Sequence, residues 1–161
     1  MKYLYLLLAS FLVISSCKEE DIIIDPDPNQ PSFTCTIDGN NFSDNTPTID
    51  ISSSDIISIS SVSEIDGVIY TIEMDIKSMP FNSINEGETI YFSSAGMGVV
   101  NYSGSTYSNT YNGPSYDGEI VFTTKSSEKL SGTFIFKAQD VDPSMFTNVW
   151  VTDGVFENIS Y

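Results

Sequence analysis

The sequence predicts an all-β fold for residues 32–161, an antiparallel β-sandwich of about nine short strands, with a flattened β-barrel as the alternative. Isoleucine, valine, threonine, tyrosine and phenylalanine alternate with polar residues, a pattern typical of half-buried strands. No window of about 11 residues has a helical period. Asp-Gly pairs, which accept the positive φ angles of tight hairpin turns, recur along the domain. They are Asp38-Gly39, Asp66-Gly67, Asp117-Gly118 and Asp153-Gly154.

The pair Asp66-Gly67 predicts the register of one hairpin. A two-residue turn at this pair places Ile65 opposite Val68, and continues to Ile57 opposite Ile76. In this register the large apolar residues share one face, and serine, glutamate and aspartate occupy the other. A slip of one residue would reverse both faces, so we expect the register to be kept. The apolar exceptions, on or beyond the polar face, are Ile56, Val62 and Ile69.

A second hairpin is expected between residues 120–125 and 130–138. Placing Phe122 opposite Phe134 aligns the apolar faces and requires a loop of odd length. Ser127-Glu128-Lys129 meets this requirement, together with a bulge.

The last pair, Asp153-Gly154, predicts a hairpin between residues 149–152 and 155–161. Both of its faces are apolar, so we expect it to be covered on both sides, or else to present Trp150 for binding. Further strands are expected at residues 33–37, 48–52, 88–92 and 97–102.

The start of the chain resembles a bacterial lipobox. Cys17 follows Lys2, an apolar run too short to span a bilayer, and the pair Ser15-Ser16. This order of features predicts that residues 1–16 are a lipoprotein signal peptide. The resemblance implies that Cys17 receives a diacylglyceryl thioether, becomes the new N-terminus and is acylated again, for example with palmitate. Two or three acyl chains would anchor the protein stably. The alternative is an ordinary thiol beside a conventional cleavage site.

Residues 17–31 are expected to be a lipidated tether, because Pro26, Pro28 and Pro31 lie among acidic residues. Lys18-Glu19-Glu20-Asp21 resembles the surface-export signal of many Bacteroidetes lipoproteins. This cluster therefore predicts a lipid-anchored protein of the outer membrane on the cell surface. If the cluster is only a solvated acidic linker, the periplasmic face of the outer membrane is the alternative location.

Composition excludes several functions. The formal net charge is −16 and the chain has no histidine, so phosphate binding, Ser-His-Asp catalysis and imidazole metal sites are excluded. We therefore expect no nucleic-acid partner, no cofactor and no metal site, although calcium binding by carboxylates and the oligomeric state stay open. Cys35 alternates with Phe33 and Ile37, which predicts a small core residue and not a catalytic thiol.

One segment has the composition of a recognition loop. Residues 102–116 combine tyrosine with serine, glycine and asparagine, which supply rigid rings between adaptable polar groups. Tyr107, Tyr111 and Tyr116 are the candidate ligand-binding residues. The alternative is a long hairpin whose tyrosines pack across strands.

Three motifs resemble small Bacteroidetes lipoproteins catalogued as a domain of unknown function. They are residues 33–40 (FTCTIDGN), residues 130–136 (LSGTFIF) and residues 151–159 (VTDGVFENI). This resemblance implies lipidation and a β fold, and it implies no chemistry. Composition and resemblance together favour a non-catalytic lipoprotein that binds a glycan, a peptide or a protein. A carboxylate-dependent hydrolase and a purely structural envelope component are the alternatives.

Overall fold

The computed structural model describes residues 27, 29–52, 56–77, 79–109 and 118–161, and in this part of the chain eleven strands form one antiparallel sheet. The strands are β1 (Ser32–Ile37), β2 (Asn40–Asp44), β3 (Thr48–Ile51), β4 (Ile57–Ile65), β5 (Val68–Ile76), β6 (Thr89–Tyr91), β7 (Gly96–Tyr102), β8 (Ser105–Ser108), β9 (Gly118–Lys125), β10 (Lys129–Asp140) and β11 (Asn148–Ser160). A 3₁₀ turn, η1 (Phe81–Ser83), and a single-turn helix, α1 (Phe92–Ala95), precede and follow β6. Neither helix, nor any other in the described residues, is long and apolar enough to cross a membrane.

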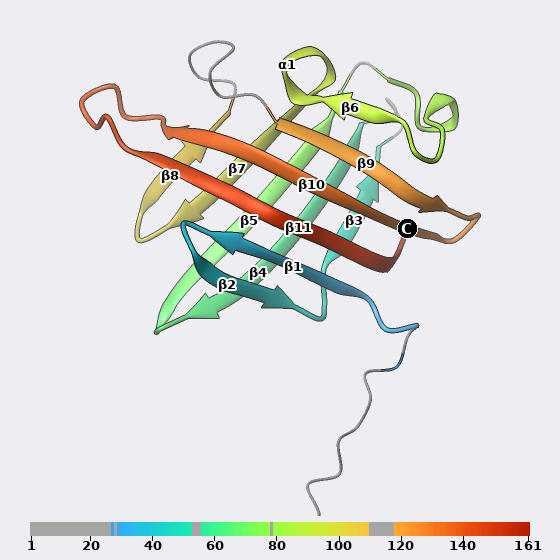
Figure 1. Cartoon of the computed structure of the whole chain (residues 1–161), viewed down its shortest axis with the longest axis horizontal. Helices are drawn as coiled ribbons and strands as arrows, with labels where there is room; N and C mark the ends of the chain where they lie inside the picture. The colour runs from blue at the N-terminus through green and yellow to red at the C-terminus, as the bar shows by residue number, and fades with distance from the viewer. Residues whose placement is uncertain (1–26, 28, 53–55, 78, 110–117) are drawn as a thin grey trace, which may run out of the picture.

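The sheet folds over into two layers (Figure 1). A front layer has the order β2-β1-β11-β10-β9-β6, and a back layer has the order β8-β7-β5-β4-β3. Strand β10 belongs to both, because residues 130–136 pair with β9 whereas Gln139 and Asp140 pair with β8. The ladder does not continue between the two end strands, β2 and β3. The predicted all-β sandwich is therefore confirmed, and the sheet is not closed into a barrel.

The core lies between the layers and is rich in phenylalanine. Phe33 packs on Phe42 and Phe134 with ring centroids 5.8 and 4.8 Å apart, and Phe122 packs on Phe156 at 5.9 Å. The back layer contributes fully buried isoleucines from β4 and β5. Each such side chain stabilises the fold by about 1.5–3 kcal/mol through burial.

The β4–β5 hairpin has the predicted register. Ile65 pairs with Val68, and the ladder continues to Ile57 opposite Ile76. Asp66 and Gly67 have φ angles of 51° and 80°, as the turn requires. The apolar exceptions Val62 and Ile69 are exposed on the outer face of the back layer.

The β9–β10 hairpin forms with a register two residues away from the predicted one. Phe122 lies opposite Gly132, and not opposite Phe134, while the ladder shifts at a bulge beside Ser131. A shift of two residues leaves the same side chains facing the core, because side chains alternate between the two faces of a strand. The reason lies at Gly132, where a Cβ atom would come within 2.4 Å of the Phe156 ring. Glycine at this position lets Phe156 cross the strand and contact Phe122.

The predicted hairpin at Asp153-Gly154 is wrong, because β11 runs through this pair without turning. Asp153 has a φ of 53°, but it forms a bulge against β1 and β10 instead of a turn. Gly154 stays in the strand, where a Cβ would lie 2.5 Å from the Phe134 carbonyl oxygen. A second bulge accompanies Asn158, whose φ is 54°, and turns Ile159 into the core.

Strand β2 was not predicted, and β8 was expected only in the alternative interpretation of residues 102–116 as a hairpin. β2 has one large apolar residue, Phe42, and β8 lies inside the tyrosine-rich segment. β2 also closes the open side of the sandwich through Asp44. The Asp44 carboxylate accepts hydrogen bonds from the Ser61 hydroxyl (2.8 Å) and the Val62 N–H (3.0 Å) of β4. These bonds bridge the two layers where no ladder joins them.

Candidate functional site

Most of the predicted site residues lie outside the described part of the chain. This holds for Cys17, for the cluster Lys18, Glu19, Glu20 and Asp21, and for Tyr111 and Tyr116. Of the pair Asp117-Gly118, only Gly118 lies in the described part of the chain, where it begins β9.

Tyr107 is described, and it is buried. Ser103 and Gly104, with φ angles of 52° and 81°, form a tight turn that folds β8 back on β7. The Tyr107 ring then stacks on Tyr102 with centroids 5.2 Å apart, and Tyr102 stacks on Tyr70 at 4.6 Å. Burial, with the hydrogen bond between the two hydroxyls, raises the pKa of Tyr102. Residues 102–108 therefore form the hairpin of the alternative interpretation, and Tyr107 offers no free ring face.

Cys35 also lies in the core, as the sequence predicts. Its side chain points inward from β1, and burial raises the pKa of the thiol to about 12. A thiol with this pKa is almost entirely protonated at neutral pH, so it is neither a nucleophile nor a good metal ligand.

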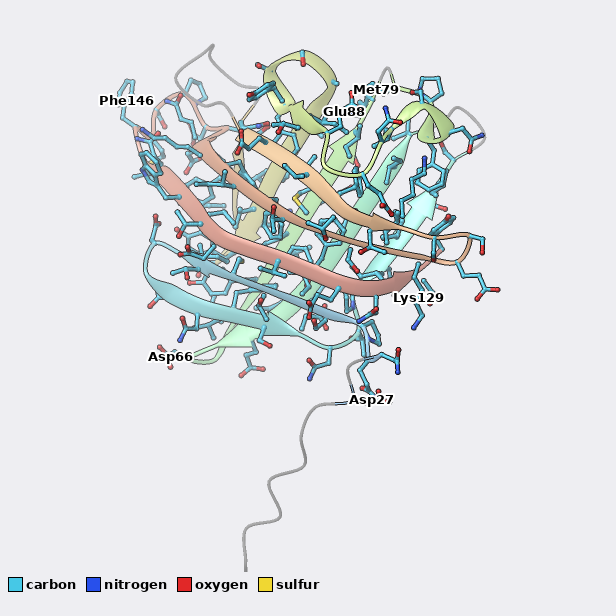
Figure 2. All side chains as sticks on the ribbon, turned by 45° about the vertical axis from the view of Figure 1, so that its right-hand side comes forward. Asp27, Asp66, Met79, Glu88, Lys129 and Phe146 are labelled. Atoms are coloured by element: carbon cyan, nitrogen blue, oxygen red, sulfur yellow. The ribbon has the colours of Figure 1, made fainter. Side chains whose placement is uncertain are left out.

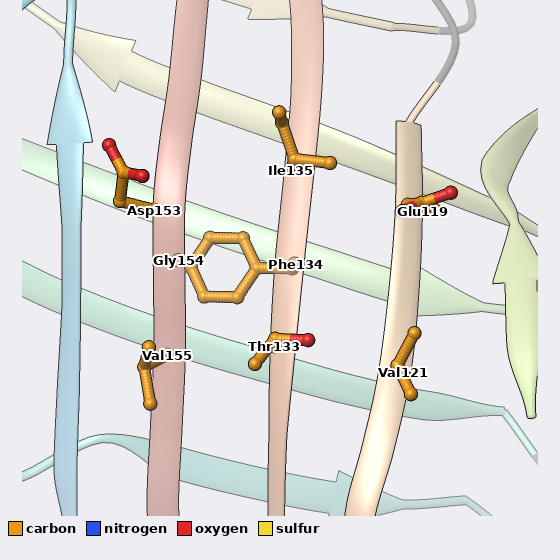
Figure 3. Close-up of a pocket in the computed structure, with 8 residues that line it drawn as sticks. All are labelled: Glu119, Val121, Thr133, Phe134, Ile135, Asp153, Gly154 and Val155. Atoms are coloured by element: carbon orange, nitrogen blue, oxygen red, sulfur yellow. The ribbon is translucent and has the colours of Figure 1, made fainter. Parts of the chain in front are cut away.

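A shallow hollow of about 330 Å³ lies on the outer face of the front layer, across β9, β10 and β11 (Figure 3). Its sides combine aliphatic, hydroxyl and carboxylate groups from alternate positions of the three strands. They are Val121, Thr133, Ile135, Val155, Glu119 and Asp153. Figure 3 shows the Phe134 ring reaching across to Gly154 beneath the hollow. Gly154 lies opposite Phe134, and the Phe134 ring fills the space that a side chain at Gly154 would need.

Two half-exposed aromatic residues share this face with the hollow. Tyr91 lies opposite Glu119, and Glu119 lies opposite Ile135, so the three side chains point to the same side of the sheet. Lys137, two residues along β10 from Ile135, lies opposite Trp150. Tyr91 and Trp150 are each 51% exposed, and Ile135 is 42% exposed.

Contacts hold both the backbone and the ring of Trp150. Its backbone exchanges two hydrogen bonds with Asp38, of 2.8 and 2.9 Å. The ammonium group of Lys137 lies 4.8 Å from the centre of the indole ring. A cation over an aromatic ring is attracted to it, and this contact reduces the mobility of the exposed indole.

Trp150 was predicted from the sequence as a residue that could be presented for binding, whereas Tyr91 and the hollow were not predicted. The signal for Trp150 was that residues 149–159 have apolar side chains on both faces, although the core needs an apolar side chain on only one face. Tyr91 and Ile135 carry no such signal, because only the pairing of β6, β9 and β10 brings them beside Trp150.

A family model described as "Domain of unknown function (DUF6252)" matches residues 29–160, which include every strand of both layers. The chain belongs to this family. Comparison with curated proteins gives no match, and comparison with solved structures gives none either. The family therefore agrees with the predicted resemblance to a domain of unknown function, and it assigns no activity.

The acidic loop between β10 and β11 of this DUF6252 domain uses its carboxylates locally. Asp140 accepts a hydrogen bond from the Asp142 N–H (2.9 Å) and one from the Thr147 hydroxyl (3.3 Å). Asp142 accepts two from Ser144, and these bonds lower its pKa. Among the described residues, no three acidic or cysteine side chains gather as a metal site would require.

The same loop of the DUF6252 domain exposes apolar side chains. Phe146 is 84% exposed and Met145 is 52% exposed. Figure 2 shows Phe146 at the edge of the molecule remote from Asp27.

Proposed function

We propose that this chain is a lipid-anchored lipoprotein of the outer membrane, exposed on the cell surface, and that it binds a partner without catalysis. The signal peptide, Cys17 and the acidic residues that follow support the anchoring and the location. The observation that carries the binding role is the outer face of the front layer. There Tyr91 and Trp150 flank a hollow with aliphatic and polar sides. A purely structural component would need no such face.

The anchoring is tested with Cys17→Ala. In wild-type cells the protein should take up labelled palmitate and remain with the outer membrane. The variant should lose the label and either stay unprocessed or be released. Label that persists in the variant would overturn the role of Cys17.

The surface location is tested by replacing Glu19, Glu20 and Asp21 together with alanine. Palmitate labelling should be unchanged, while protease added to whole cells should no longer reach the protein. Equal accessibility in wild type and variant would mean that the cluster is only a linker.

The binding role is tested through Trp150, which is the one tryptophan of the chain. Its emission reports directly on the outer face. The full lipidated chain in detergent is mixed with an extract of extracellular polymers, either untreated, digested with protease, or oxidised with periodate to destroy sugars. A shift of emission with any of the three supports a binding role at this face. No shift with any of them would refute it.

Carboxylate-dependent hydrolysis is a second candidate, because Glu119 and Asp153 both line the hollow. They lie on β9 and β11, with β10 between them, so strand spacing puts their Cα atoms roughly 10 Å apart. This is close to the carboxyl separation of about 6.5–9.5 Å in inverting glycosidases. Release of reducing sugar that Glu119→Gln abolishes would establish hydrolysis. Binding without release would exclude it.

A further inference from the structure

We infer that the outer face of the front layer binds a neutral polysaccharide chain, which lies across β6, β9, β10 and β11 between Tyr91 and Trp150. This inference rests on the proposed binding function and names the ligand of the same face.

The two aromatic rings lie far apart on one face of the sheet. The pairings Tyr91–Glu119, Glu119–Ile135 and Lys137–Trp150 place both rings on one face, three strands and two residues apart. Strand spacing and rise per residue make this separation roughly 15 Å. An extended chain of several sugar rings spans such a distance, whereas one small molecule does not. The rings therefore suit two separate contacts with one long ligand.

The side chains between the two rings match the chemistry of a sugar surface. Aliphatic Val121 and Ile135 alternate with the hydroxyl of Thr133 and the carboxylates of Glu119 and Asp153. A pyranose ring has apolar C–H groups on its faces and hydroxyl groups at its edge. It can therefore contact the aliphatic and aromatic groups while its hydroxyls donate to the carboxylates. Tyrosine and tryptophan are well suited to this role, because both combine an apolar body with a polar tip.

The negative charge of this face favours a neutral ligand. Glu119 and Asp153 lie in the hollow itself, and the chain as a whole has a formal net charge of −16. Sulfated or uronate polymers would be repelled by both. Lys137 adds one positive charge beside Trp150, which does not outweigh the two carboxylates and the negative charge of the whole chain.

The pairing of the strands under this face favours a polysaccharide over a peptide. An extended peptide usually binds by adding a strand to a free sheet edge, where its backbone forms hydrogen bonds. Strands β9, β10 and β11 are each paired on both sides, so the hollow offers side chains and no free backbone ladder. A ligand read through ring faces and hydroxyls fits this surface better.

The experiment titrates the full lipidated chain in detergent with four soluble neutral polysaccharides, an α-glucan, a β-glucan, a mannan and a xylan, and with polygalacturonate as the anionic probe. Trp150 emission is recorded throughout. At least one neutral polymer should shift the emission to shorter wavelength and protect the ring from acrylamide quenching. Polygalacturonate should do neither.

Two variants locate the site. Tyr91→Ala should weaken binding of the active polymer at least tenfold, while leaving Trp150 to report. Ile69→Ala is the matched control, since Ile69 is an exposed apolar residue on the outer face of the back layer. It should bind as wild type does. Near-ultraviolet circular dichroism checks that both variants are folded.

The outcomes separate the inference from the function on which it rests. Equal binding by Tyr91→Ala and Ile69→Ala would overturn the site. A response to polygalacturonate alone, or to none of the five polymers, would overturn the ligand class. If the periodate-oxidised extract still shifts Trp150 while the protease-digested one does not, the partner is a protein, and only the proposed binding function survives. No response to any polymer or extract would remove both.

Discussion

Asp44 is expected to hold the two layers together on the open side of the sandwich. Its carboxylate accepts four hydrogen bonds, two from Thr46 on its own chain segment and two from Ser61 and Val62 across the gap. Hydrogen bonds to a charged group contribute about 1.5–3 kcal/mol each. Asp44→Ala removes all four and leaves the Val62 N–H without this acceptor. We therefore expect the free energy of unfolding to fall by about 3 kcal/mol, counting the two bridging bonds alone.

The measurement is urea denaturation at pH 7, followed by Trp150 fluorescence. A double-mutant cycle with Ser61→Ala isolates the bridge, and a coupling of about 1–2 kcal/mol is expected between the two positions. Asp142→Ala is the matched control, because Asp142 also accepts hydrogen bonds from a nearby serine but lies fully exposed in a loop. It should have much the smaller effect. A loss below about 1 kcal/mol in Asp44→Ala, or no coupling to Ser61, would refute the bridge.

The same bridge predicts a pH dependence. Burial raises the pKa of Asp44, but the hydrogen bonds from Val62, Thr46 and Ser61 outweigh burial and lower it below its usual value. The ionised carboxylate is therefore favoured by folding. Its contribution is complete above the unfolded pKa of about 3.9 and is lost as the pH falls through the lower folded pKa. The stability difference between wild type and Asp44→Asn should accordingly shrink below about pH 4. A constant difference down to acid unfolding would contradict this.

Three further predictions concern buried positions. Tyr107→Ala should lower the free energy of unfolding by about 3 kcal/mol, because it removes the ring that stacks on Tyr102. Tyr107→Phe keeps the ring and loses only the hydroxyl, so it should lower the free energy of unfolding by about 1 kcal/mol. Equal effects of the two variants in urea denaturation would contradict the stack. Gly154→Ala should destabilise by about 2 kcal/mol, since the new Cβ would meet the Phe134 ring and carbonyl, and a variant as stable as wild type would show that β11 shifts freely. In a Cys17→Ala background, Cys35 should resist iodoacetamide at pH 8 and react rapidly in urea; fast labelling of the folded protein would contradict its burial and its pKa of about 12.

The fold class and the β4–β5 hairpin could be predicted because the information is local. An Asp-Gly turn and strict alternation together determine both the register and the buried face of Ile57–Ile65 and Val68–Ile76. The β9–β10 register could not be predicted in this way. It depends on Phe156, more than twenty residues later in the chain, crossing the strand at Gly132.

The error at Asp153-Gly154 has a related cause. The same dipeptide supplies a positive φ both for a two-residue turn and for a bulge, and its sequence does not distinguish them. The neighbours decide, because β1 and β10 pair with β11 before and after the bulge. Burial of Gly154 against Phe134 then keeps the strand straight enough to continue. A long central strand resulted where two short ones were expected.

This continuous strand is also what creates the candidate site. If β11 had turned at Asp153, Val155 would not lie beside Thr133, and Trp150 would lie at a sheet edge. The bulge instead leaves Asp153 and Val155 on the face that contains Trp150, and all of the residues from Asp153 to Val155 line the hollow. Ser32, where the predicted tether joins β1, lies opposite Glu157. Seven residues of strand, roughly 20 Å, separate Glu157 from Trp150. Under the proposed anchoring and binding roles, Trp150 would therefore lie at the end of β11 remote from the membrane. The predicted acidic, proline-rich tether, roughly 40 Å long when extended, would leave room for a polymer to reach it.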